Sequence, residues 1–170
     1  MPRHVSDQSK PLFRRLGETL RALVGGRALK LMSVYPPYLA AGVRVVDVSD
    51  DATRFDVEMR LRFWNQNYFG THFGGSLYAM CDPFFALILT EALGPDYVVW
   101  DKASTIRFLR PGRGTVRARF EIPAEHIAAS RRDADAAGRA EVTLPVDVLG
   151  PADERVAHVT KVLSVRSRRR

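Results

Sequence analysis

Residues 76–93 read SLYAMCDPFFALILTEAL, and this stretch decides the fold. It is apolar nearly all the way round a helix, and Gly94 and Pro95 behind it are strong helix stops. A helix that lacks a polar face has to be buried on every side. The sequence therefore predicts a long central helix, and the rest of the chain has to be arranged around it.

Six other segments alternate apolar and polar residues, which is the period of a half-buried strand. They span residues 43–48, 54–63, 98–109, 115–122, 140–148 and 156–165. Pro145 interrupts the fifth segment and indicates an edge or a bulge. Residues 125–137 favour a helix but are weakly apolar, so that helix is expected on the surface. This order of elements predicts an α+β fold, a six-stranded antiparallel sheet wrapped around one long central helix.

The pattern divides the chain into three parts. Residues 1–41 are an N-terminal helical extension, residues 42–166 are the sheet-and-helix domain, and residues 167–170 are a basic tail. The apolar stripe of the extension can pack on its own domain or lie on a membrane. Packing is favoured because the stripe is short and no second membrane signal accompanies it. The tail is interpreted as a frayed, solubilising terminus.

Composition narrows the class of protein. A length of 170 residues with 46% hydrophobic and 26% charged residues fits one globular domain and excludes a disordered chain. Cys81 is the only cysteine and the four histidines are far apart in the sequence, so neither disulfides nor a metal site is expected, and no cofactor is implied. The chain shows no signal core and no uninterrupted membrane span, so a cytoplasmic location is expected. The net charge of +7 suits an anionic partner.

Two features carry the chemistry. The loop of residues 65–75, NQNYFGTHFGG, ends in a glycine pair where the first N–H groups of a helix are unpaired and can face an oxyanion or a phosphate. Asp82 follows Gly74 by eight residues, and an ionised carboxylate in an apolar helix is costly unless it is paired, hydrated or facing a cleft. The carboxylate either caps a break at Pro83 or serves as a general base or nucleophile opposite backbone donors, and the second reading is favoured.

These residues resemble a known family. The string Asn67-x-x-Gly70-x-x-Phe73-Gly74-Gly75 followed by Asp82 is similar to the hotdog-fold thioesterases of the PaaI-like type. The downstream string Phe108-Leu109-Arg110-Pro111-Gly112-x-Gly114 resembles a turn of the same family. The N-terminal helical extension is closer to an uncharacterised hotdog subgroup, which is DUF4442-like. The resemblance implies a hotdog fold over residues 42–166 and a homodimer, often paired into a tetramer, with active sites at the subunit interface.

The resemblance also implies roles for individual residues. Asp82 would be the catalytic carboxylate, Gly74 the backbone N–H donor to the thioester carbonyl, and Asn67 an ordering or water-binding side chain. The chain departs from the family at Phe73, where a histidine is usual, and the nearest imidazole, His72, comes one residue earlier. Together with Gly75, these two residues are candidates for substrate binding.

Three further candidates lie downstream. Asp101 stands where related enzymes often use a hydroxyl residue, and it is expected either to perturb the pKa of Asp82 or to form a strand-end salt bridge with Lys102. Arg110 and Arg113 crowd the Pro111 turn, where they either bind the phosphates of coenzyme A or are simply solvated.

The sequence therefore predicts an acyl-CoA thioesterase that forms a homo-oligomer. The alternative is a non-catalytic acyl-CoA or lipid-binding hotdog protein, which the replacement at Phe73 favours. A nucleic-acid partner is not favoured, because the basic strands lack interleaved aromatic residues.

Overall fold

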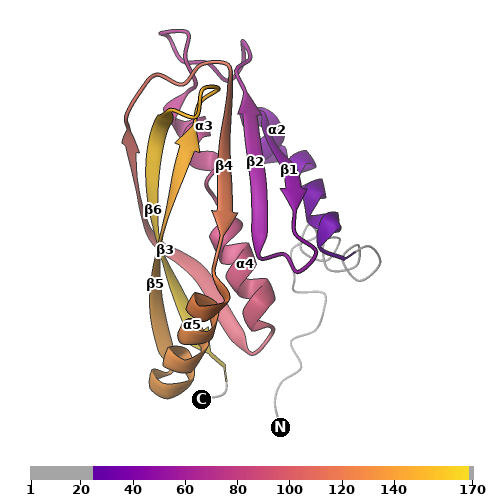
Figure 1. Ribbon diagram of the computed structural model, residues 1–170, viewed down its shortest axis with the longest axis vertical. Coiled ribbons are helices and arrows are strands. Elements are labelled where there is room, and N and C mark those ends of the chain that lie inside the picture. The colour runs from indigo at the N-terminus through magenta and orange to yellow at the C-terminus, as the bar shows by residue number, and fades with distance from the viewer. Residues whose placement is uncertain (1–24, 169–170) are drawn as a thin grey trace.

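The computed structural model describes residues 25–168, with side chains described from Leu29 onward. Six strands form one antiparallel sheet in the order β1-β2-β4-β5-β6-β3 (Figure 1). The strands are β1 (Val43–Val48), β2 (Arg54–Arg60), β3 (Tyr97–Phe108), β4 (Thr115–Glu121), β5 (Arg139–Leu149) and β6 (Arg155–Ser167). The predicted α+β class, with an antiparallel six-stranded sheet around a central helix, is confirmed.

The central helix is interrupted. It consists of α3 (Gly74–Ala79) and α4 (Phe84–Leu93), and both lie behind the sheet in Figure 1. Between them the N–H of Asp82 donates to the carbonyl of Ala79 at 3.2 Å, a tighter pairing than that of an α-helix. Pro83 has no N–H to continue the ladder, so the chain restarts as α4 at the next residue. The expected continuous helix is thus two helices in the same layer, with the turn of residues 80–83 between them.

Aromatic rings join the helix layer to the sheet. Phe84 of α4 lies with its ring centroid 4.8 Å from that of Phe120 in β4 and 5.4 Å from that of Phe55 in β2. Phe55 and Phe120 are also direct partners in the β2–β4 register, and all three side chains are fully buried. Burying a Phe side chain contributes about 1.5–3 kcal/mol. This cluster therefore holds α4 against the centre of the sheet.

Two predicted strands end differently from the pattern. The strand predicted over residues 54–63 ends at Arg60. Phe63, which the alternation predicts on the apolar face of that strand, is exposed. The sixth extends further, to Ser167, and the N–H of Arg168 donates to the carbonyl of Asp96 at 2.8 Å. The first part of the predicted basic tail is therefore tied to the domain, and residues 169–170 lie outside the described residues.

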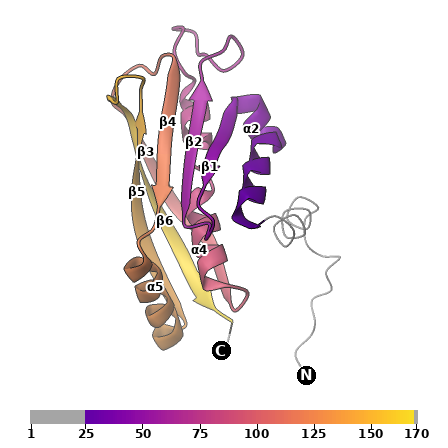
Figure 2. The same cartoon turned by 45° about the vertical axis from the view of Figure 1, so that its right-hand side comes forward.

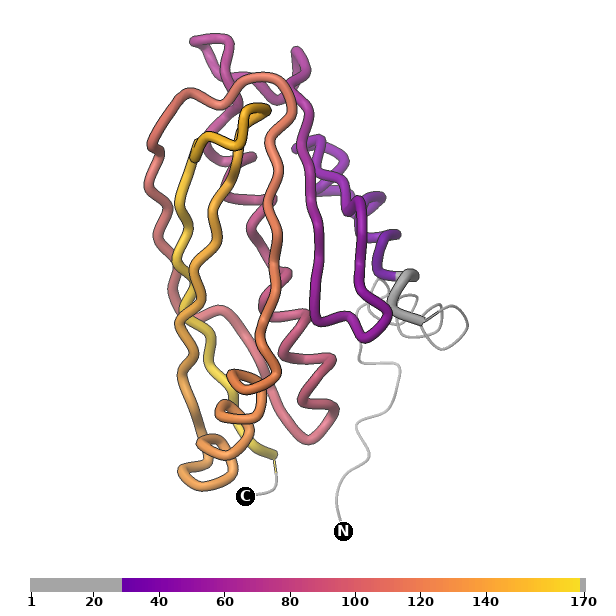
Figure 3. Tube along the Cα trace, viewed as in Figure 1, coloured from indigo at the N-terminus to yellow at the C-terminus, as the bar shows by residue number. Residues whose placement is uncertain are grey.

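The sheet opens between β4 and β5. The two strands are paired only at Arg117–Leu149 and Ala118–Val148, and in Figure 3 their traces diverge from that end. Pro145 lies in the part of β5 that pairs with β6 alone, so one side of β5 is locally an edge there, as the proline indicated. Surface helix α5 (Ala124–Ala137) precedes β5.

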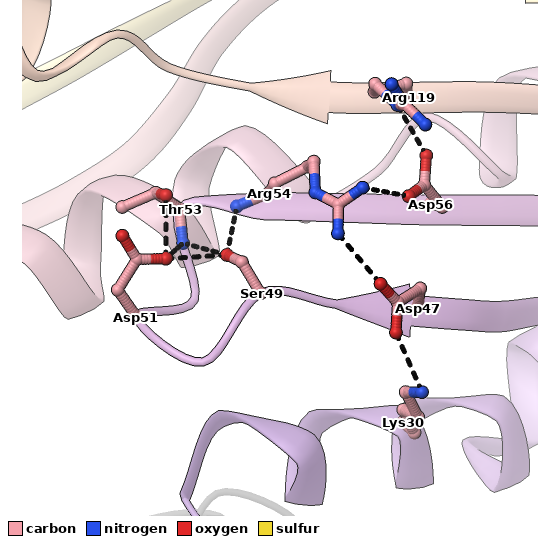
Figure 4. A network of polar contacts seen from close by, with 8 residues as sticks. All are labelled: Lys30, Asp47, Ser49, Asp51, Thr53, Arg54, Asp56 and Arg119. Carbon is pink, nitrogen blue, oxygen red and sulfur yellow. Dashed lines mark hydrogen bonds and ion pairs between the residues drawn. The ribbon is translucent and has the colours of Figure 1, made fainter.

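The N-terminal extension stands beside β1 (Figure 2). Its described part contains a 3-10 helix, η2 (Gly25–Val34), and a short α-helix, α2 (Pro36–Ala41). The Ser33 hydroxyl accepts a hydrogen bond from the N–H of Val45, and Lys30 pairs with Asp47 of β1 (Figure 4). The predicted first helix, within residues 12–24, lies outside the described residues.

Candidate active site

Asp82 lies in the turn between α3 and α4, and not within a helix. Its side chain is 47% exposed, because the helix interruption turns it out of the apolar layer. Its backbone carbonyl accepts a hydrogen bond from the hydroxyl of Tyr38 in α2, so the N-terminal extension reaches this turn directly. The fold therefore holds the backbone of Asp82 while leaving its carboxylate accessible.

A buried lysine binds the Asp82 carboxylate. The Nζ of Lys161, in β6, lies 3.0 Å from Oδ1 of Asp82 and 3.1 Å from Oδ2 of Asp101, in β3. Its side chain is only 1% exposed, and its ammonium lies 5.5 Å from the ring centroid of Tyr78 in α3. The structure thus brings Asp82 and Asp101 together, as the sequence suggested, but through a third residue. We refer to Asp82, Asp101 and Lys161 as the buried triad.

The partner predicted for Asp101 is wrong. Lys102 pairs with Glu141 of β5 on the outer face of the sheet. Successive side chains of a strand point to opposite faces, so Asp101 and Lys102 face different sides of the sheet, and the β3–β6 register shifts only between Asp101 and Ala103. Asp101 therefore points to the core side, where Lys161 replaces Lys102 as its cation.

The pKa values of Asp101 and Lys161 are both raised, for different reasons. Burial, followed by the hydrogen-bonding contact with Asp82, raises the pKa of Asp101. Burial alone would lower the pKa of Lys161, but its contacts with both carboxyl groups outweigh burial and raise it. Lys161 therefore stays charged in an apolar setting. Asp101 takes up a proton more readily than an ordinary aspartate.

Gly74 and Gly75 open α3 beneath two aromatic rings. A Cβ on Gly74 would lie 2.9 Å from Cζ of Phe108, and one on Gly75 would lie 2.4 Å from Cε1 of Phe73. Close ring packing is therefore one reason for a glycine at each position. Gly74 begins α3 and Asp82 follows its end, so six helical residues, roughly 9 Å of axial rise, separate them. One chain does not bring the Gly74 N–H into hydrogen-bonding reach of the Asp82 carboxylate.

The sequence from residue 26 to residue 165 matches the family described as "Domain of unknown function (DUF4442)". The match covers the extension from residue 26 onward and the sheet up to residue 165. This chain belongs to the DUF4442 family. Among curated protein sequences, none matches this chain.

Solved structures share the architecture of this DUF4442 chain. A protein of unknown function from Pseudomonas aeruginosa, described as a probable thioesterase, has a TM-score of 0.72 at 22% identity, with 84% of this chain and 93% of that chain covered. A thioesterase from Haemophilus influenzae has a TM-score of 0.64 at 17% identity, with coverage of 85% and 92%. A mutant of the phenylacetic acid degradation protein PaaI from Thermus thermophilus has a TM-score of 0.55 at 26% identity, with coverage of 76% and 97%. The expected DUF4442-like membership and the expected hotdog fold are therefore confirmed.

Asn67 organises the loop before α3. Its Oδ1 accepts hydrogen bonds from the N–H groups of Phe69 and Thr71 at 2.9 and 3.2 Å, and its Nδ2 donates to the Thr71 hydroxyl at 3.0 Å. These contacts use the amide for the shape of the loop itself. Of the two roles that the resemblance implies for Asn67, the geometry favours ordering.

His72 faces the turn between β3 and β4. Its Nε2 lies 3.1 Å from the carbonyl oxygen of Gly114, and its ring packs on Gly112, where a Cβ would lie 3.2 Å from Cδ2 of the ring. Burial lowers the pKa of the imidazole. The described contacts of His72 join it to this turn, and the structure does not bring it together with Asp82.

Arg110 and Arg113 are exposed in the same turn. The Nη1 of Arg113 lies 3.5 Å from the carbonyl oxygen of Gly70, and the backbone N–H of Arg110 donates to the carbonyl of Val156. The Arg113 guanidinium therefore borders the loop of residues 65–75, and Arg110 lies in the same turn. They lie with Asn67 and His72 at one end of α3, while the buried triad lies at the other.

Sequence reasoning missed Lys161. The signal that could have revealed it is strand parity, because Val159, Leu163 and Val165 are fully buried on one face of β6 and Lys161 falls on the same face. A charged residue in phase with three core residues indicates a buried partner or a site.

Proposed function

We propose that this protein hydrolyses an acyl thioester of the acyl-CoA class, with Asp82 as the general base or nucleophile. The observation that carries the proposal is a carboxylate that is half-exposed and backed by a buried ammonium at the break in the central helix. As a base, Asp82 would take a proton from water, and the resulting hydroxide would add to the thioester carbonyl carbon before the thiolate leaves. The thioesterases among the structures with this fold support the same reaction class.

The proposal includes a homo-oligomer, because one chain leaves the site incomplete. The Gly74 N–H, the candidate oxyanion donor, lies at the far end of α3 from Asp82. Grooves of about 250 and 390 Å³ are bordered by Trp100 and by Trp64, and among the described residues that line them Asp82 is not included. The donor facing Asp82 would then come from a second copy.

The free edge of the sheet is the proposed contact between copies. β3 is twelve residues long, ends the sheet and carries Asp101, and an unpaired edge strand is a template for pairing with another strand. Pairing of β3 with β3 of a second copy would bring two buried triads near one interface. Sedimentation of the protein at micromolar concentration is expected to show a dimer or a tetramer, and a strict 19.1 kDa monomer would contradict this arrangement.

A hydrolysis panel tests the function. Short, long and aromatic acyl-CoAs are offered to the parental protein and to Asp82→Asn, which keeps the side-chain volume and removes the charge. We expect turnover of at least one acyl-CoA by the parental protein and a kcat roughly 10²- to 10⁴-fold lower in the variant, with KM little changed.

Asp56→Asn is the matched control, since Asp56 is an ion-paired carboxylate on the opposite part of the sheet. It is expected to keep kcat within about twofold. Near-parental kcat in a folded Asp82→Asn protein would refute the catalytic assignment. Saturable acyl-CoA binding without turnover would instead support the non-catalytic alternative, for which the exposed Phe73 ring over Gly75 is the specific observation.

A further inference from the structure

Lys161 sits where an apolar residue is expected. Its neighbours in phase on β6, Val159 and Leu163, are fully buried, and its register partner on β5 is Leu144. Moving an ammonium group from water into such a place costs several kcal/mol unless partners satisfy it. Packing alone therefore does not account for a lysine here, and the reason has to lie in what its ammonium touches.

The ammonium is held from three sides. Asp82 approaches from the α3–α4 turn and Asp101 from β3, at 3.0 and 3.1 Å, and the ring of Tyr78 in α3 covers a third side. An ammonium has three N–H donors, of which two here meet carboxyl oxygens. Because Asp82 is far more exposed than Lys161, the lysine acts from behind the carboxylate and leaves its outer side open to a substrate.

The charge of the buried triad follows from the groups around it. Three further titratable groups lie against it from the packed elements: Tyr38 of α2, Tyr78 of α3 and Cys81 of the turn. Burial raises the pKa of Cys81 to about 12, and burial also raises that of Tyr38, so both stay neutral at physiological pH. One ammonium therefore faces two carboxyl groups, and a single bound proton makes the set neutral.

The geometry indicates where that proton lies. Asp101 is 25% exposed, about half as much as Asp82, and its Oδ1 is buried without a hydrogen-bond partner among the described residues. A buried carboxylate oxygen that accepts no hydrogen bond is costly when charged. Oδ1 of Asp101 is therefore the better place for a proton.

We propose that Lys161 is a positioning residue that holds the Asp82 carboxylate ionised and oriented, while Asp101 carries the one proton shared by the two carboxyl groups. The part of Lys161 in catalysis rests on the proposed thioester hydrolysis, whereas the location of the proton does not. The two statements therefore call for separate measurements.

The first measurement is the pH–rate profile of Lys161→Met with the best acyl-CoA. Methionine keeps much of the length of the side chain and removes the charge. An opposite charge at this distance moves a carboxyl titration by one to three units, so the acidic limb of the profile is expected to move up by about one to three pH units. Activity lost at neutral pH then returns as the pH is raised. Lys161→Arg, which keeps the charge, is expected to restore the position of the limb.

The second measurement needs no activity. In protein labelled with ¹³C at the aspartate side-chain carboxyl carbon, one carboxyl signal of the pair is expected to titrate above the ordinary aspartate range, and Asp101→Asn is expected to abolish that titration. Asp82→Asn is expected to keep this signal and to move its midpoint down, because the neighbouring negative charge is gone.

The outcomes separate the two proposals. A high-pH carboxyl titration that survives Asp101→Asn would overturn the location of the proton, even if Lys161→Met does not fold. If folded Lys161→Met keeps the acidic limb of its pH–rate profile at the parental pH, the proposed role of the lysine is overturned. If no acyl-CoA is hydrolysed by any form while the carboxyl titrations behave as described, the proposed function fails, the positioning role falls with it, and the location of the proton stands.

Discussion

Two clusters of ionised side chains, both joining distant strands, are built in opposite ways. On the outer side of the sheet, Lys30, Asp47, Arg54, Asp56 and Arg119 alternate in sign across η2, β1, β2 and β4 (Figure 4). Their contacts measure 2.7–2.9 Å, and every member keeps roughly a quarter or more of its side chain in solvent. In the buried triad the contacts are slightly longer, but the central cation has almost no access to water.

This difference shows that contact distance is a poor guide to what an ion pair does. The outer cluster gives up little hydration, so its pairs stabilise the fold only modestly while fixing the N-terminal extension to the sheet. The buried triad carries a desolvation cost that an apolar residue at position 161 would avoid. A costly charge that the fold nevertheless retains, behind an accessible carboxylate, is typical of a functional site.

The strongest test of the comparison replaces one lysine in each cluster. Lys161→Met leaves two carboxyl groups without their cation, and we expect the free energy of unfolding to fall by about 3 kcal/mol. This lies at the lower end for a broken buried pair, because half-exposed Asp82 can recover some hydration. Lys30→Met is the matched control on the outer cluster and is expected to cost at most about 1 kcal/mol. Urea unfolding at neutral pH measures both.

High salt is expected to increase the difference between the two lysine variants. At 1 M salt the Debye length falls to about 3 Å, so the effect of Lys30→Met is expected to shrink toward zero while that of Lys161→Met persists. Equal losses for the two variants, or equal sensitivity to salt, would show that burial does not distinguish the clusters.

The fold could be predicted because its main signals are local. The alternation in residues 43–48 and 115–122 and the apolar run of residues 76–93 each report burial within one element, and the observed strands follow them closely. The break at residues 80–83 was less visible, because apolar residues continue on both sides of Pro83 and only the backbone shows two separate helices.

The candidate site was predictable only where a residue stood out within its own segment. Asp82 did so as a lone acid among apolar residues, whereas Lys161 is a lysine in a strand that also contains Arg155 and Arg166. Its importance lies in a contact across 79 residues with Asp82, which no local pattern contains. For His72 the local pattern suggested too much. Its place near the glycine pair suggested substrate binding, whereas its ring contacts the carbonyl oxygen of Gly114 in the β3–β4 turn.

A variant of His72 tests, with the smallest expected effect, the idea that burial determines the cost of charging a side chain. The folded state holds the imidazole neutral, with its pKa below the ordinary value of 6.5 because of burial, so it binds fewer protons than the unfolded state in mildly acidic solution. The stability it contributes is therefore present above pH 6.5 and is lost as the pH falls toward the folded-state pKa. His72→Gln, whose amide can donate to Gly114 and never titrates here, is expected to remove that loss.

The readout is the thermal midpoint at pH 7 and at pH 5. We expect the drop between the two to be smaller in His72→Gln than in the parental protein by about 2 °C, which corresponds to somewhat less than 1 kcal/mol for a chain of this size. His126, exposed on α5, is the matched histidine, and His126→Gln should leave the drop unchanged because that side chain is exposed. A drop of parental size in His72→Gln would mean that the buried imidazole accepts its proton without opening the turn, and burial would then not set the cost of charge in this part of the molecule.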